Sequence, residues 1–199
     1  MAILEGDRLG EARAIIDRYP EGRQRSAVMP LLYLAQSVDG HITRAALQEV
    51  AGLIGVRTAE VEAVASFYTM LRLRPTGTHL IAVCTNLSCA LRGANDVYEA
   101  AHEATGIPHG GELSDDGLFS VHEEECLGAC ELAPVVQVNV ANHDEVTPDR
   151  VRAIVGALRE GVVPEPARGP AIQSFKAASR LLAGLEPLEA ATTTEGASA

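Results

Sequence analysis

The 199-residue sequence lacks several features that define common functional classes. Its longest apolar stretch runs only from Val28 to Ala35, whereas a helix needs roughly 20 apolar residues to cross a bilayer. The N-terminus lacks the basic start and apolar run of a secretory signal. Gly110-Gly111 has neither the Gly-x-Gly-x-x-Gly spacing nor the following Lys-Ser/Thr of a phosphate-binding loop. We therefore expect a cytoplasmic chain with no direct membrane insertion and no nucleotide site of its own.

Basic residues are absent from one long segment. Residues 93–149 contain thirteen Asp or Glu and no Lys or Arg, while the residues before and after this segment each sum to a charge of +1. The net charge of −11 therefore arises in this segment alone. Nucleic acid and anionic lipid demand clustered cations, so both are excluded as partners. A solvated acidic face is the common explanation for such a run.

The sequence also lacks any Cys-x-x-Cys motif, although it contains four cysteines. Four residues separate Cys84 from Cys89, thirty-six follow, and three separate Cys126 from Cys130. In a cytoplasmic protein such cysteines indicate metal ligands more than disulfides. Three interpretations remain open: a structural zinc site, a thiol-disulfide pair and a 2Fe-2S cluster. Gaps of two residues are typical of zinc and of redox pairs, so the longer gaps favour the cluster.

Apolar spacing divides the chain into an N-terminal helical part and a mixed part. Residues 1–75 repeat the i, i+3, i+4, i+7 pattern of amphipathic helices, which predicts a bundle of about four helices. Hydroxyl side chains stand where helices would begin, at Ser26, Thr43, Thr58 and Thr147, and glycines stand where helices would end, at Gly22, Gly40, Gly55 and Gly161. Residues 76–161 contain short β-rich runs at 78–83, 118–121 and 135–140, with helical patterns at 94–101 and 151–158. This order predicts a compact α/β domain. Residues 162–199 form a C-terminal extension that is expected to be partly disordered or to lie along partner subunits, with a possible helix over 173–185 and a disordered end from 190 to 199.

The predicted strands place both cysteine pairs in loops at strand ends, where a sheet can bring them together. The surrounding residues suit cluster sulfurs: the side chains or backbone N–H groups of four of them can donate to sulfur, namely Asn86, Ser88, Gly93 and Gly128. Carboxylates flank the second pair at Glu123, Glu124, Glu125 and Glu131. Because a reduced cluster carries more negative charge than an oxidised one, these carboxylates predict a low reduction potential.

Three stretches carry a resemblance to a known family. They are Cys84-Thr85-Asn86-Leu87-Ser88-Cys89, then Glu125-Cys126-Leu127-Gly128-Ala129-Cys130 with Ala133-Pro134, and upstream Ser66-Phe67-Tyr68-Thr69-Met70. Over residues 7–160 the chain resembles the E-type subunit of NADH:quinone oxidoreductase, or respiratory complex I, which is the thioredoxin-like 2Fe-2S subunit. The resemblance implies a thioredoxin-like 2Fe-2S ferredoxin domain preceded by an N-terminal helical bundle, and it implies that this bundle, residues 1–75, docks on a larger subunit that carries FMN. It further implies that Cys84 and Cys89 ligate one iron, that Cys126 and Cys130 ligate the other, and that Pro134 stands where such folds often keep a cis-proline.

The same resemblance implies a non-catalytic electron-transfer role in the peripheral arm, on the cytoplasmic side of the membrane. The FMN and the NADH site would lie in a partner subunit of the F type, and a multi-cluster iron-sulfur subunit of the G type would lie beside it. An equivalent subunit of an NAD-linked hydrogenase or formate dehydrogenase is the alternative. A structural zinc module with four cysteines is the distant alternative.

Other residues that could suggest a site have simpler interpretations. We expect no metal at His122, because the four cysteines complete the ligand set. His109 lies in a sequence typical of a turn. Phe67, Tyr68 and Met70 could line a docking surface, but their helical spacing favours packing in the core.

Overall fold

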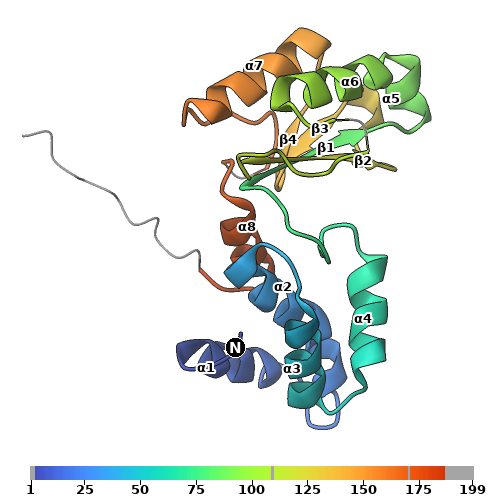
Figure 1. The fold of residues 1–199 in the computed structure, drawn as a ribbon. Coiled ribbons are helices and arrows are strands. Elements are labelled where there is room, and N and C mark those ends of the chain that lie inside the picture. Colours follow the sequence, from blue (N-terminus) through green and yellow to red (C-terminus); the bar gives the residue numbers. More distant parts are fainter. Residues whose placement is uncertain (1–2, 109, 170, 187–199) are drawn as a thin grey trace, which may run out of the picture.

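The computed structural model describes residues 3–108, 110–169 and 171–186 (Figure 1). Helices and strands follow one another in this order: α1 (Asp7–Ile16), the 3-10 turn η1 (Gln24–Ala27), α2 (Val28–Asp39), α3 (Arg44–Ile54), α4 (Thr58–Phe67), β1 (His79–Cys84), α5 (Leu87–Leu91), α6 (Ala94–Thr105), β2 (Phe119–Glu124), η2 (Cys130–Leu132), β3 (Val136–Val138), β4 (Ala141–His143), α7 (Pro148–Arg159) and α8 (Phe175–Leu182). Some element bounds differ from the predicted ones by a few residues. The strand predicted at 118–121 begins one residue later and extends to Glu124. None of the helices in the described ranges is long and apolar enough to cross a membrane.

The first four helices form the predicted bundle around a core of their own, which includes Leu31, Val50 and Val61. Local capping sets the helix ends: the Thr43 hydroxyl accepts a hydrogen bond from the Ala46 N–H at 3.1 Å, as its sequence position predicts. The left-handed glycines expected after α2 and α3 are also present. Ser26 and Thr58 do not act as the expected caps. Ser26 lies within η1, and Thr58 is already the first residue of α4.

A four-stranded sheet in the order β2-β1-β3-β4 forms the second unit. β1 and β2 run parallel, whereas β3 pairs antiparallel with both β1 and β4. Helices α6 and α7 cover one face of this sheet (Figure 1). Alternate strand residues such as Ile81, Val121 and Val138 pack beneath them in the core. The parallel pairing requires a crossover, which α5, α6 and the following loop provide.

The predicted strand over 135–140 was wrong in its extent. Asn139 adopts a left-handed backbone with φ of 56°, and the chain turns there, so that β3 and β4 form a hairpin. The Asn139 side chain stabilises this turn, since its Oδ1 accepts from the Leu80 N–H at 2.8 Å. Asparagine tolerates the left-handed region better than most residues. Helix α5 was not predicted at all.

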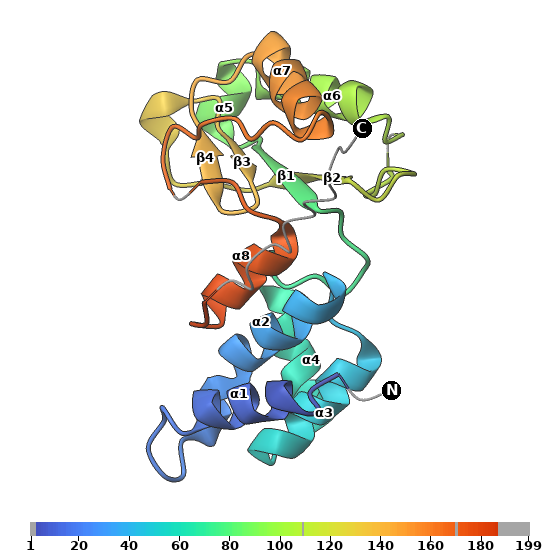
Figure 2. The ribbon, with the colours of Figure 1, turned by 90° about the vertical axis from the view of Figure 1, so that its left-hand side faces the viewer.

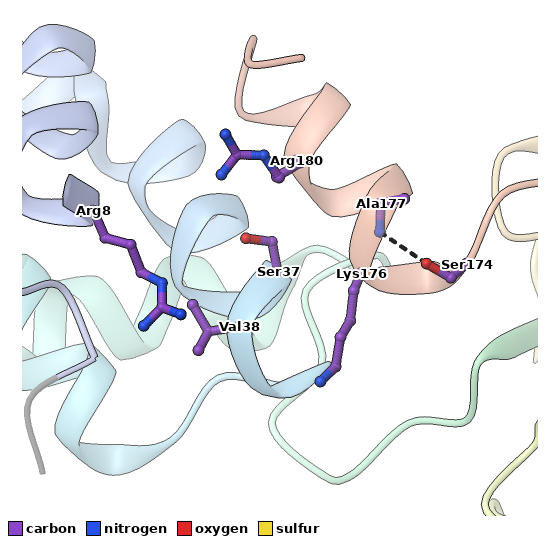
Figure 3. A pocket seen from close by; sticks show the side chains of 7 residues that line it. All are labelled: Arg8, Ser37, Val38, Ser174, Lys176, Ala177 and Arg180. Carbon is purple, nitrogen blue, oxygen red and sulfur yellow. Dashed lines mark hydrogen bonds between the residues drawn. The ribbon is translucent and has the colours of Figure 1, made fainter. Parts of the chain in front are cut away.

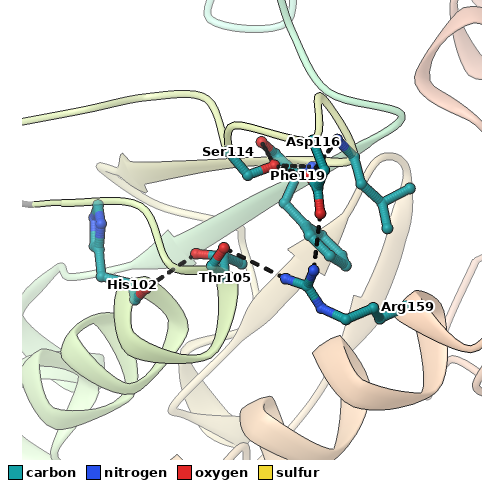
Figure 4. A network of polar contacts seen from close by, with 7 residues as sticks. His102, Thr105, Ser114, Asp116, Phe119 and Arg159 are labelled. Carbon is teal, nitrogen blue, oxygen red and sulfur yellow. Dashed lines mark hydrogen bonds and ion pairs between the residues drawn. The ribbon is translucent and has the colours of Figure 1, made fainter.

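Polar contacts fix the loop before β2 against α7, and Figure 4 shows them. The Arg159 guanidinium, at the end of α7, donates to Asp116 at 2.8 Å and lies 5.2 Å from the centre of the Phe119 ring. The Ser114 hydroxyl accepts from the Phe119 N–H at 2.9 Å. These contacts hold the first residue of β2 in register, and β2 leads directly to the second cysteine pair.

Part of the C-terminal extension belongs to the folded structure. The helix expected over 173–185 forms as α8 and packs on α2 of the bundle (Figure 2). Its Ser179 hydroxyl accepts a hydrogen bond from the buried Gln36 amide at 3.0 Å, and Arg180 forms an ion pair of 2.6 Å with Glu11 in α1. The disorder predicted for residues 190–199 lies outside the described residues.

Candidate metal centre

All four cysteines lie at one edge of the sheet. Cys84 is the last residue of β1, and Cys89 lies in α5, which follows directly. Cys126 follows β2 after one residue, and Cys130 begins η2. Because β1 and β2 are parallel, with Cys84 opposite Glu124, the two cysteine loops leave the sheet from the same edge. This edge is the one to which both strands point on the right of Figure 1.

Within that edge the thiols approach one another as two pairs. Cys84 hydrogen-bonds with Cys89, and Cys126 hydrogen-bonds with Cys130. The two pairs are also close to each other, since the Cys130 sulfur interacts electrostatically with both Cys84 and Cys89. Cys84 and Cys89 are buried, each 2% exposed, whereas Cys126 and Cys130 are exposed. The centre therefore has a buried half and a half that faces solvent.

Backbone and hydroxyl groups surround the sulfurs. The Gly128 N–H donates to the Cys126 Sγ at 3.3 Å, the Val135 N–H donates to Cys89, and the Ser88 hydroxyl donates to Cys130. Ser88 and Gly128 therefore occupy the donor positions that the sequence indicated. Asn86 has another role, because its side-chain oxygen accepts from the Leu87 N–H and caps α5. Gly93 is a cap too, in a left-handed conformation before α6.

Burial and crowding disfavour thiolates in the protein alone. Burial, followed by the hydrogen bond with Cys84, raises the pKa of Cys89 to about 11. The hydrogen bond with Cys126 and its charge raise the pKa of Cys130 as well. Thiols with raised pKa values lose their protons only when positive charge stabilises the thiolates, and iron ions supply such charge. Four thiols of this character are a donor set for a soft metal.

The loop that leads into β3 completes the site. The Ala133–Pro134 peptide bond is cis, at the position where the resemblance implied a cis-proline. The Pro134 carbonyl accepts from the Val146 N–H at 2.9 Å, and the Leu132 carbonyl accepts from the Glu145 N–H at 2.8 Å. Two backbone hydrogen bonds from the segment after β4 therefore anchor the loop that carries Cys130.

The described residues, the four cysteines included, do not form a site for a lone metal ion. No group of three or more His, Cys, Asp or Glu side chains is arranged among them to hold a single metal ion. His122 lies half-buried on β2, and burial lowers its pKa to about 4, so it is neutral at physiological pH. His109, expected in a turn, lies outside the described residues.

The aromatic residues upstream of the site differ from the prediction. Phe67 is 77% exposed and Tyr68 is 42% exposed, so the expectation that they pack in the core was wrong. The reason is local: α4 ends at Phe67, and Tyr68 has an extended backbone with ψ of 122°, which takes it out of the helical stripe. Met70 does pack against the bundle core.

A cavity of about 290 Å³ lies between α2 and α8, remote from the cysteines (Figure 3). Arg8, Lys176 and Arg180 line it, together with Ser37 and Ser174. The Arg180 guanidinium is already engaged by Glu11. The cavity has no connection with the sulfur site.

Comparison with known proteins places this arrangement in a family. The family described as thioredoxin-like [2Fe-2S] ferredoxin matches residues 12–159. The E-type subunit of NADH-quinone oxidoreductase from Mycobacterium tuberculosis is 44% identical over 175 residues, which cover 88% of this chain and 68% of that protein. NADH-quinone oxidoreductase subunit 2 of Thermus thermophilus is 43% identical over 145 residues, covering 72% of this chain and 80% of that protein.

Among solved structures, a NAD+-reducing [NiFe]-hydrogenase in its H2-reduced state aligns with a TM-score of 0.59. The match has 20% sequence identity and covers 68% of this chain and 22% of the hydrogenase chain. This likeness supports the fold. Together the comparisons confirm the predicted family, the fold class and a 2Fe-2S cluster as the type of cofactor. The chain belongs to the thioredoxin-like [2Fe-2S] ferredoxin family, and within it to the E-type subunits of NADH-quinone oxidoreductase.

Proposed function

We propose that this chain is an electron-transfer subunit that holds one 2Fe-2S cluster through Cys84, Cys89, Cys126 and Cys130. The first two cysteines ligate one iron and the last two the other. The observation that carries this proposal is the meeting of two loops, far apart in sequence, whose four sulfurs interact as two neighbouring pairs. Two thiolates for each iron is the arrangement that a 2Fe-2S cluster needs.

When bound, the cluster supplies a one-electron redox centre. The residues of this chain hold it and set its environment. The N–H groups of Val135 and Gly128 and the Ser88 hydroxyl donate to three of the sulfurs. In this proposal the chain contributes no substrate site and no catalytic side chain of its own. NADH is oxidised at the FMN of a partner subunit.

The charges around the site support a low reduction potential. Glu123, Glu125 and Glu131 are exposed and lie within a few residues of Cys126 and Cys130. Reduction adds a negative charge to a centre that is already anionic, and nearby carboxylates oppose this addition. Their exposure to water weakens the effect of each, so the number of carboxylates matters more than any one of them.

We further propose that the chain works in the peripheral arm of NADH:quinone oxidoreductase, on the cytoplasmic side. Its neighbours there are the F-type subunit, which carries FMN and the NADH site, and the G-type multi-cluster subunit. The identity of 44% with the E-type subunit of M. tuberculosis supports this assembly over a hydrogenase or a formate dehydrogenase. Co-purification of a quinone-reducing membrane arm checks the assignment, because neither alternative includes one.

Metal analysis tests the cluster directly. We expect about two irons and two acid-labile sulfides per chain, and a reduced-cluster EPR signal. Cys126→Ser should lose or distort this signal, whereas His122→Gln, a change at a nearby residue that is not a ligand, should keep it. A normal EPR signal in Cys126→Ser, or zinc in place of iron, contradicts the proposal.

A further inference from the structure

Arg72 is a largely buried cation in the linker of residues 68–78, which joins α4 to β1. Its backbone is bound to the helical bundle, because the Arg72 N–H donates to the Gln36 Oε1 at 2.7 Å and its carbonyl accepts from the Ile42 N–H at 2.6 Å. Its guanidinium donates to Glu112, in the loop before β2, at 3.0 Å. Only 14% of the Arg72 side chain is exposed. Burying a charge costs free energy, so the fold holds this guanidinium in place against that cost.

The guanidinium lies on the side of the sheet that α6 and α7 leave uncovered. Strand side chains alternate between the two faces, and Val121 packs in the core beneath the helices, so Ser120 and Glu124 point to the opposite face. The linker passes on that side in Figure 1. The Ser120 hydroxyl also accepts a hydrogen bond from the Gly77 N–H of the linker at 2.9 Å. The linker that carries Arg72 is therefore bound to β2 from below.

Carboxylates neutralise the positive charge of Arg72 only in part. Burial lowers the pKa of Arg72, while the charges of Glu112 and then Glu124 raise it, so the guanidinium interacts electrostatically with both carboxylates. Its Nε is buried and has no hydrogen-bond partner among the residues that the structure describes. Arg74 approaches the same Glu112 carboxylate at 3.6 Å, so two cations share it. Positive charge therefore remains beneath the sheet.

The end of β2 connects this charge to the metal centre. Glu124 lies opposite Cys84 in the register of the two parallel strands, and Cys126 follows Glu124 after one residue. The acidic segment that carries the second cysteine pair contains no Lys or Arg, so any cation near the centre must come from another part of the chain. Arg92, next to α5, is such a cation, but 58% of its side chain is exposed. Solvent screens Arg92 more strongly than it screens Arg72.

We propose that Arg72 raises the reduction potential of the cluster by holding a positive charge beneath the sheet edge that carries the cysteines. This inference rests on the proposed function. Reduction adds one negative charge to the centre, and a nearby cation stabilises the reduced form more than the oxidised form. The effect opposes that of the exposed carboxylates beside Cys126 and Cys130. Arg72 acts on the centre through its charge and is not a ligand.

An EPR-monitored redox titration of the cluster-loaded chain tests this charge effect. At a fixed applied potential, we expect Arg72→Gln to lower the ratio of reduced to oxidised cluster by roughly tenfold, the equivalent of about 59 mV for one electron. The shift should remain at high salt, because the charge is buried. Arg72→Lys keeps the charge and should stay within about twofold. Arg74→Gln is the matched control: Arg74 contacts the same carboxylate, but its side chain is 79% exposed, so the ratio should change by less than about twofold.

A change at the partner carboxylate separates the charge effect from damage to the fold. Glu112→Gln removes a negative charge and should raise the ratio, by roughly threefold because Glu112 is 39% exposed. The double variant Arg72→Gln/Glu112→Gln should lie between the two single variants. Loss of the ion pair as a structural contact would instead shift both single variants in the same direction.

The inference is overturned if the two single variants, at normal cluster content, leave the ratio unchanged or shift it in the same direction. If Arg72→Gln does not fold, the sign of the shift in Glu112→Gln decides the question. If the unmodified chain shows no 2Fe-2S signal to titrate, the proposed function fails instead.

Discussion

Replacing Gln36 with leucine should separate the bundle from the segments that pack on it. Gln36 is completely buried in α2, and its amide makes three hydrogen bonds. The Nε2 donates to the Met70 carbonyl at 2.9 Å and to the Ser179 hydroxyl at 3.0 Å, while the Oε1 accepts from the Arg72 N–H at 2.7 Å. This one side chain therefore joins α2, α8 and the linker that leads to β1.

The expected loss in the free energy of unfolding follows from the polar groups that Gln36→Leu leaves without partners. Gln36→Leu leaves a carbonyl and an N–H of the linker unpaired, and each unpaired buried group costs about 1–3 kcal/mol. Both linker groups are only partly buried, and the new leucine gains some hydrophobic free energy, so we expect a net loss of about 2–3 kcal/mol. In a chain of this size that lowers the melting temperature by roughly 5–10 °C.

Urea unfolding, followed by far-UV circular dichroism, measures this loss on samples with equal cluster content. Ser37→Ala is the matched control, because the Ser37 hydroxyl donates only to the Leu34 carbonyl of the same helix, at 2.7 Å. We expect the control to lose less than about 0.5 kcal/mol. If Gln36→Leu unfolds at the same urea concentration as the control, the hydrogen bonds of Gln36 do not hold these segments together.

Three further variants test other contacts. Ser88→Ala removes the hydroxyl that donates to Cys130, and an EPR-monitored redox titration should show a midpoint lower by roughly 40 mV, the equivalent of about 1 kcal/mol for one electron. Arg180→Met should cost about 1 kcal/mol at neutral pH in urea unfolding, because Arg180 hydrogen-bonds to Glu11 and lowers its pKa. That difference is fully present above pH 4.5, the ordinary pKa of a glutamate, and it is lost progressively as the pH falls from there through the lower folded pKa of Glu11, so a constant difference down to pH 3 would contradict the ion pair. Burial lowers the pKa of His122 to about 4, so the unfolded chain binds a proton that the native chain does not, and stability should fall between pH 6.5 and 4. His122→Gln should flatten this part of the stability curve, and an unchanged slope would refute the assignment.

Sequence patterns predicted what depends on neighbouring residues along the chain. Thr43 and Thr147 cap their helices as expected, because a cap needs only a hydroxyl and the N–H groups that follow it. The cysteine edge was predictable for a related reason. The sequence placed Cys84 after the strand at 78–83 and the second pair before the strand at 135–140. Because β3 runs antiparallel to β1, with Val83 opposite Val136, the end of the first strand and the start of the other lie at one edge. The direction in which the strands pair depends on distant packing, which the local patterns do not show.

Features that depend on a single backbone angle or on distant packing were missed. The turn at Asn139 interrupts an apolar run with no glycine or proline, and it is stabilised by Leu80, a residue far away in sequence. The spacing of Val61, Ala65 and Tyr68 marks one helical face, but it cannot show that the helix ends before Tyr68. The exposure of Tyr68 follows from that end, whereas Phe67 is the last residue of the helix and lies off the face that carries Val61 and Ala65.

The C-terminal segment links the two units, although the family match ends at residue 159. The Phe175 N–H donates to the Thr78 carbonyl at 2.8 Å, and the Asn139 amide donates to the Gln173 carbonyl, so the segment is bound to the sheet before α8 begins. Helix α8 then packs on α2, which binds the same segment to the bundle. The C-terminal segment therefore contacts both units, through hydrogen bonds beside the sheet and through the packing of α8 on the bundle, and it restrains the position of one unit relative to the other.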